Sequence, residues 1–143
     1  MYGNLSSPFA PRNQRATMYS KVGLETDVHA ASPHRLVAML FDGAFEAMSQ
    51  ARAAIQTGNT ELKNRMLSRA VRILDEGLKA SLNLQAGPLS NDLGELYAYL
   101  CRRLTLANLH SDVPAIDECQ RLLAPVRDAW HAIAPQADVP NAA

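Results

Sequence analysis

The fold is decided by the stretch SPHRLVAMLFDGAFEAMSQARAAIQTGN, Ser32–Asn59, which has the features of a complete amphipathic helix. Ser32 is a residue type that caps helix N-termini, and Pro33 takes the first helical position, where its missing N–H does no harm. One face is apolar at three- and four-residue spacings, at Leu36, Leu40, Ala44, Ala47, Ala51 and Ala54. The stretch therefore predicts a helix from Ser32 to about Gln56 that stops at Thr57-Gly58-Asn59.

Three further helices are predicted from the same kind of pattern. One runs from about Thr60 to Leu84 and ends at Ala86-Gly87-Pro88, and the next spans about Asn91 to Leu109. The last follows the cap-like Asp112 and runs to about Ile133. Its seam consists of Ile116, Cys119, Leu123, Val126, Trp130 and Ile133. Four helices joined by short loops predict an all-α protein, an antiparallel up-down four-helix bundle.

Composition agrees with this fold and separates the bundle from both ends of the chain. Only 6% of the residues are aromatic, and Ala and Leu, which favour helices, are abundant. We expect residues 1–31 to be a flexible N-terminal tail and arm, residues 32–134 to form the bundle, and residues 135–143 to be a disordered tail. The arm is too apolar for an idle linker, because it carries Met18, Tyr19, Val22, Leu24 and Val28.

Charge and hydropathy exclude several classes of partner. Fourteen basic and fourteen acidic residues give a formal net charge of zero, which is unlike the basic surface of a nucleic-acid-binding protein. No apolar run approaches the length of a membrane span, and the N-terminus has no signal-peptide pattern. The two cysteines are too few for a disulfide framework. We expect a cytoplasmic protein that binds no nucleic acid and does not insert into a membrane.

The residues that could carry chemistry are scattered. The four histidines form neither a metal-binding HExxH pair nor the Glu-x-x-His of di-iron bundles, and neither cysteine belongs to a CxxC motif. Phosphate-binding loops and nucleophile motifs are missing from the sequence as well. The sequence therefore predicts a protein that is not an enzyme and has no catalytic, cofactor-binding or metal-binding residues.

The second predicted helix carries more apolar surface than one core face needs. Besides a stripe through Met66, Ala70 and Ile73, a second stripe lies roughly 100–160° further round the helix. It consists of Leu67, Val71, Leu74, Leu78 and Leu82. On the third helix, Tyr99, Leu106 and Leu109 point away from the core face. Surplus apolar surface is typical of a docking site for a partner. The alternative is that the helix phase is different and the arm covers this surface.

Gly43 and Gly77 stand near the middle of predicted helices, where Gly costs about 1 kcal/mol relative to Ala. A residue without Cβ permits a close approach of another chain. Two explanations stay open: each glycine packs tightly against a neighbouring helix of the bundle, or it forms the floor of a shallow trough for a bound chain.

Five fragments in a fixed order carry a resemblance to a known family. They are Tyr19, then ASPHRL, MLFDGA, NDLGELYAYLCRRLTLAN and LLAPVRDAW. Together they span about Tyr19 to Ile133, and their order and spacing resemble the FliS family of flagellin export chaperones. The resemblance implies a helical bundle that binds the disordered C-terminal segment of flagellin in the cytosol. It implies that the bundle prevents early polymerisation and hands flagellin to the flagellar type III secretion apparatus.

The resemblance also implies which residues meet a partner. In the family, the N-terminal arm can lie over apolar surface when no client is bound, and Tyr19 and Val22 match that arm. With the surplus apolar residues, the predicted partner-binding set is Tyr19, Val22, Leu67, Val71, Leu74, Leu78, Tyr99 and Leu106. The export gate and flagellar regulators are further expected partners. The alternative function is a helical adaptor, or a homodimerising bundle protein, with no flagellin client.

Overall fold

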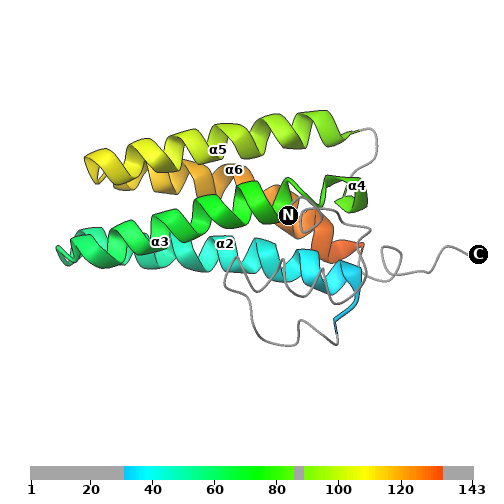
Figure 1. Cartoon of the computed structure of the whole chain (residues 1–143), viewed down its shortest axis with the longest axis horizontal. Helices are drawn as coiled ribbons and strands as arrows, with labels where there is room; N and C mark the ends of the chain where they lie inside the picture. Colours follow the sequence, from blue (N-terminus) through cyan, green and yellow to red (C-terminus); the bar gives the residue numbers. More distant parts are fainter. Residues whose placement is uncertain (1–30, 86–88, 134–143) are drawn as a thin grey trace, which may run out of the picture.

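The computed structural model describes residues 31–85 and 89–133, and within these ranges every regular element is helical (Figure 1). The long helices are α2 (Pro33–Gln56), α3 (Thr60–Arg72), α5 (Ser90–His110) and α6 (Val113–Ala132). A π-helical segment, η2 (Ile73–Leu78), continues α3, and the short helix α4 (Leu82–Gln85) follows after a turn. The prediction of an all-α four-helix bundle is confirmed.

The long helices lie side by side along the long axis of the molecule (Figure 1). The colour gradient runs in opposite senses along consecutive long helices, so that each returns beside its predecessor. Helix α3 packs against both α2 and α5, and α6 likewise packs against α2 and α5. None of the helices in the described ranges is both long enough and apolar enough to cross a membrane.

Side-chain caps fix where three of the helices begin. Ser32 Oγ accepts a hydrogen bond from Arg35 N (3.1 Å), Asn59 Oδ1 from Leu62 N (3.1 Å), and Asp112 Oδ1 from Ala115 N (3.2 Å). Each bond satisfies an N–H that has no partner within its own helix. The predicted bounds of α2, α5 and α6 agree with the structure to within about one residue.

The predicted faces of the first and last helices form the core. The whole α2 face is buried, and on α6 the seam residues Ile116, Cys119, Leu123 and Trp130 are buried. Val126 is only partly buried and packs against the core. Ile133, at the end of the seam, is 42% exposed.

The prediction that a second stripe on residues 60–84 lies outside the core is wrong for Leu67, Leu74 and Leu78, whereas Val71 and Leu82 are partly buried. Leu67 is 1% exposed and both Leu74 and Leu78 are completely buried. The reason is that α3 and η2 have two neighbours. One side meets α2, where Gly77 lies against the side chain of Leu40. The other side meets α5, so an apolar surface about twice the usual width is buried within the bundle itself.

The predicted continuous helix from Thr60 to Leu84 is also interrupted. In η2 the backbone bond runs from Lys79 N to Leu74 O (3.0 Å), five residues apart. A π-helical turn of this kind inserts one extra residue and displaces the chain that follows. Ser81 Oγ then donates to Gly77 O (2.9 Å), and Gln85 Nε2 donates to Leu78 O (2.7 Å). These two side-chain hydrogen bonds therefore hold the segment between η2 and the end of α4 against the last turn of η2.

Polar contacts join α2 to α6 along the outside of the core. Arg52 Nε donates to Asp117 Oδ1 (2.8 Å), and the same guanidinium also reaches Gln120. The guanidinium of Arg127 lies 4.1 Å from the centre of the Phe45 ring. Both members of the Arg52–Asp117 pair are partly exposed, so the pair adds little stability and mainly fixes how the two helices align.

Candidate functional site

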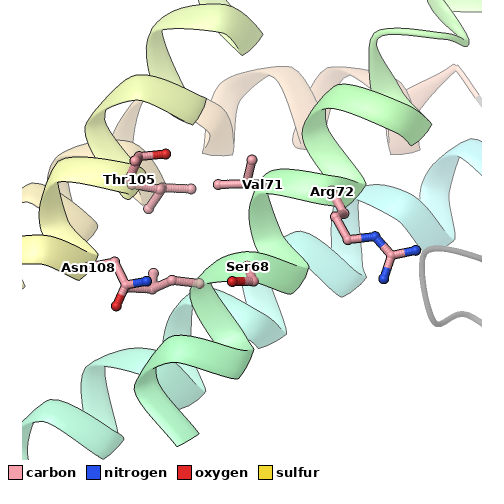
Figure 2. Close-up of a pocket in the computed structure, with 7 residues that line it drawn as sticks. Ser68, Val71, Arg72, Thr105 and Asn108 are labelled. Atoms are coloured by element: carbon pink, nitrogen blue, oxygen red, sulfur yellow. The ribbon is translucent and has the colours of Figure 1, made fainter. Parts of the chain in front are cut away.

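An apolar groove runs between α3 and α5 on the outside of the bundle (Figure 2). Its volume is about 290 Å³, and the residues that line it are Leu67, Ser68, Val71, Arg72, Leu104, Thr105 and Asn108. All of them come from facing turns of the two helices. Figure 2 shows Val71 and Thr105 pointing toward one another across the gap, with Ser68 one turn away on α3.

The groove has an apolar floor and a polar rim. Leu67 and Leu104 are buried at the floor, and Val71 is half-buried above them. Ser68, Arg72 and Thr105 are exposed at the rim. The hydroxyl of Thr105 donates to Cys101 O (2.8 Å) within α5. A site of this kind can bury an apolar side chain of a partner while the rim stays in water.

The thiol of Cys101 lies where α5 meets α3. Its Sγ is 3.8 Å from Val71 O, close enough for a weak hydrogen bond. Burial raises the pKa of Cys101 to about 11, and burial likewise raises the pKa of Cys119 to about 12. Only the thiolate is a good nucleophile. Both cysteines are therefore inert structural residues at neutral pH.

A buried lysine holds one end of the groove in place. Lys63 of α3 is 8% exposed, and its Nζ donates to Asn108 O and to Ser111 Oγ, both at 2.9 Å. Asn108 O belongs to the last turn of α5, whose carbonyls have no partner within the helix and carry partial negative charge. The ammonium group therefore ties the start of α3 to the end of α5 and fixes the spacing between the groove walls.

A second apolar hollow lies between α2, the start of α5 and the end of α6, beside the last residue of α4. Its volume is about 390 Å³. It is lined by Phe41, Gln85, Leu89, Leu93, Pro125, Val126, Ala129, Trp130 and Ile133. Leu89 is 59% exposed. Apolar residues left open at a concave surface are typical of a place where a partner docks.

Trp130, which lines this hollow, is held in place by His34. Their rings stack with centroids 4.9 Å apart and planes 12° from parallel. His34 Nε2 donates to Trp130 O (2.8 Å), and Trp130 Nε1 donates to His34 O (3.0 Å). The reciprocal bonds fasten the first turn of α2 to the last turns of α6. Trp130 is therefore held in one orientation while it lines the hollow.

Tyr99 belongs to a network on the far side of α5, where α5 meets α6. Its hydroxyl donates to Glu118 Oε2 (2.6 Å), and Arg103 Nε donates to Glu118 Oε1 (2.8 Å). The hydrogen bond from Tyr99, with that from Arg103, lowers the pKa of Glu118. The same bond to Glu118 raises the pKa of Tyr99. The hydroxyl of Tyr99 therefore already has a hydrogen-bond partner within the bundle, the carboxylate of Glu118.

The six predicted partner-binding residues that the structure describes fall into four groups. Leu67 and Val71 line the groove, whereas Leu74 and Leu78 are core residues with no exposed surface. Tyr99 is half-buried in the α5–α6 network, and Leu106 is 47% exposed on α5. The two arm residues, Tyr19 and Val22, lie outside the described residues.

Sequence reasoning missed the polar rim and the hollow. Ser68, Thr105 and Asn108 look like ordinary surface residues of separate helices, and only the packing of α3 on α5 brings them together. The hollow did leave a signal in the sequence. Leu89 and Ile133 are apolar residues at helix ends, outside the centre of any stripe, and both line it.

Comparison with known proteins gives consistent matches. The family model described as flagellar protein FliS matches residues 15–137. The flagellar secretion chaperone FliS of Salmonella typhimurium is 44% identical over 120 residues, which cover 83% of this chain and 89% of that protein. FliS of Escherichia coli K12 is 40% identical over 113 residues (78% and 83%). Flagellar secretion chaperone FliSB of Pseudomonas aeruginosa is 34% identical over 116 residues (80% and 91%).

Proposed function

Because the chain belongs to the FliS family of flagellar secretion chaperones, we propose that it binds the C-terminal segment of flagellin in the cytosol. Binding would keep flagellin from polymerising early and deliver it to the flagellar type III secretion apparatus. The family membership inferred from the sequence fragments is confirmed by the match over residues 15–137.

The observation that carries the proposal is the apolar groove between α3 and α5. A disordered client segment has no core of its own, so it gains free energy by burying apolar side chains on a preformed surface. The groove offers Leu67, Val71 and Leu104 for this purpose. The hollow around Trp130 offers a second place at the other end of the bundle.

The N-terminal arm is proposed to compete with the client. Met18, Tyr19 and Val22 are apolar, and an arm that docks on the bundle would shield the surface that flagellin later occupies. The apparent affinity for the client would then fall by the fraction of time that the arm is docked. The export gate and flagellar regulators would meet other surfaces of the loaded complex.

We infer that the protein acts by binding and not by catalysis. Burial raises the pKa of the partly buried Cys101 to about 11 and that of the buried Cys119 to about 12, so both thiols are protonated at neutral pH. The match to a chaperone family points the same way.

A second candidate function is supported by leucines on α5 and α6. Leu109 is 72% exposed, Leu106 47% and Leu122 40%. Such residues could instead join two copies of the bundle, which would suit a homodimerising adaptor that has no flagellin client.

Size-exclusion chromatography with light scattering separates the two functions. The protein alone and the protein mixed with a flagellin C-terminal fragment are compared at several concentrations. The chaperone function predicts the mass of a 1:1 complex. A stable homodimer whose mass does not change when the fragment is added would support the adaptor and refute the chaperone.

Paired variants then test which surface the client uses. Ser68→Glu places a charge at the groove rim, and Asn64→Glu makes a similar change on an exposed turn of α3 outside the groove. Ala129→Asp charges the hollow, and Ala53→Asp does the same on the exposed side of α2. Only the first member of each pair should weaken the complex.

A further inference from the structure

We propose that Asn108 recognises the main chain of the client, by hydrogen-bonding a peptide group of an extended segment that lies in the α3–α5 groove. This inference rests on the proposed chaperone function and adds to it a conformation for the bound segment and a residue that selects it.

The starting observation is a buried polar atom without a partner. Asn108 Oδ1 has essentially no accessible surface, and it finds no hydrogen-bond partner in the described part of the chain. The backbone carbonyl of the same residue is satisfied by Lys63 Nζ (2.9 Å). Figure 2 shows the carboxamide at the edge of the groove, between α5 and Ser68 of α3. A buried acceptor left without a donor destabilises the free protein.

The chemistry of a carboxamide matches that of a peptide group. Its oxygen accepts and its nitrogen donates, side by side, which complements a backbone N–H and C=O. The χ2 torsion of Asn is soft, so the carboxamide of Asn108 can turn until its oxygen and its nitrogen both face the groove. The oxygen, which is unpaired in the free protein, then gains a donor in the complex and the nitrogen gains an acceptor.

The need for free backbone groups selects the conformation of the client. An α-helix satisfies its interior N–H and C=O groups by its own hydrogen bonds, and so has none to offer along its length. An extended segment leaves them free, and its successive side chains point to opposite sides. One side chain can therefore enter the floor formed by Leu67, Val71 and Leu104, while the neighbouring peptide group meets Asn108.

The lining of the groove narrows the sequence of that segment. Leu67, Val71 and Leu104 form an apolar floor, so the side chain that enters it must be apolar to be buried there. The structure therefore points to an extended client segment with an apolar anchor residue.

The first test replaces the carboxamide by an apolar side chain of similar size. For Asn108→Leu we expect binding of a flagellin C-terminal fragment to weaken by about 3- to 10-fold, the usual range for one hydrogen bond. The melting temperature should not fall, because an unpaired buried acceptor is removed. Asn64→Leu makes the same change at an exposed position of α3 that does not line the groove and should leave the affinity within about 2-fold. If Asn108→Leu disturbs the fold, Asn108→Ser is measured instead, with the same expected loss of affinity.

The second test finds the client's peptide group. Backbone amides of a synthetic client fragment are N-methylated one at a time, and each peptide is titrated against the wild type and Asn108→Leu. We expect one position where methylation weakens binding to the wild type and has no further effect on the variant. The proposal is overturned if Asn108→Leu binds like the wild type, or if every methylation weakens both proteins equally.

Failure of this inference is distinguishable from failure of the proposed function. If the wild type binds the fragment and the Asn108 variants bind equally well, only the role of Asn108 is refuted. If the wild type forms no complex at all, the chaperone function fails, and the inference fails with it.

Discussion

Gly77 of η2 lies directly against the side chain of Leu40 in α2. A Cβ placed on Gly77 would approach Leu40 Cδ2 to 2.7 Å and Leu40 Cδ1 to 3.2 Å. Leu40 itself is completely buried. This contact decides between the two explanations that the sequence left open for Gly77: the missing Cβ permits close packing between helices of the bundle.

Gly77→Ala should therefore destabilise the fold. Overpacking of this kind costs about 1–3 kcal/mol, and the better helix propensity of Ala offsets up to about 1 kcal/mol of it. A net loss of about 1 kcal/mol in the free energy of unfolding is expected from urea denaturation. Gly94→Ala is the matched control, because its Cβ would lie 3.5 Å from Leu82 Cδ1, an ordinary contact. That variant should be neutral or more stable, and equal losses in the two variants would contradict the account.

Lowering the pH should remove the contribution that the Tyr99–Glu118–Arg103 network makes to the stability of the fold. Its hydrogen bonds lower the pKa of Glu118 below the ordinary value of 4.5. A lowered pKa in the folded state means that the stabilisation is present above pH 4.5 and is lost as the pH falls through the folded-state value. The melting temperatures of the wild type and Glu118→Gln should thus differ at pH 7 and converge in acid.

The matched control for this measurement is Glu95→Gln, on an exposed position of α5. That variant should follow the wild type at every pH. If the difference in melting temperature between the wild type and Glu118→Gln stays constant from pH 7 down to pH 3, the network does not act through the charge of Glu118.

The helix ends and the two simple core faces were predictable because their causes are local. Ser32 and Asp112 cap their helices by accepting a hydrogen bond from the backbone N–H three residues later. On α2, the spacing of the apolar residues predicts which side chains face the core. Leu74 and Leu78 were assigned wrongly because the angular argument assumed one neighbouring helix. The number of helices that pack against α3 depends on the tertiary structure, which the sequence pattern does not give. The groove depends on it too, because its walls, with Ser68 and Thr105, come from two helices that are far apart in sequence.

The two thiols should be protected from alkylation in the folded protein. Burial raises the pKa of Cys101 to about 11 and that of Cys119 to about 12, so the thiolate is scarce at pH 8. Iodoacetamide should modify both at least ~10-fold more slowly than in urea, with Cys119 the slower because it is completely buried. Mass spectrometry of timed samples gives the rates. Equal rates in native and unfolded protein would contradict the burial.

If the arm docks on the bundle as proposed, removal of residues 1–28 should uncover apolar surface and make the free protein more prone to self-association. Removal of residues 1–15 should change little, since that tail is polar and rich in Ser, Pro and Asn. Sedimentation velocity measures both truncations. If the arm only competes with the client, the longer truncation should bind flagellin more tightly, and Tyr19→Ala should shift affinity in the same direction. Weaker binding with an intact fold would refute pure competition.

Isothermal titration of a flagellin C-terminal fragment into the full-length protein tests the central claim most directly. The account predicts one fragment per chain, with a negative heat-capacity change from burial of apolar surface. It also predicts weaker binding for Ser68→Glu at the groove rim and unchanged binding for Asn64→Glu on the same helix. No binding heat, or equal affinity for the wild type and every groove variant, would contradict the claim that this surface receives the client.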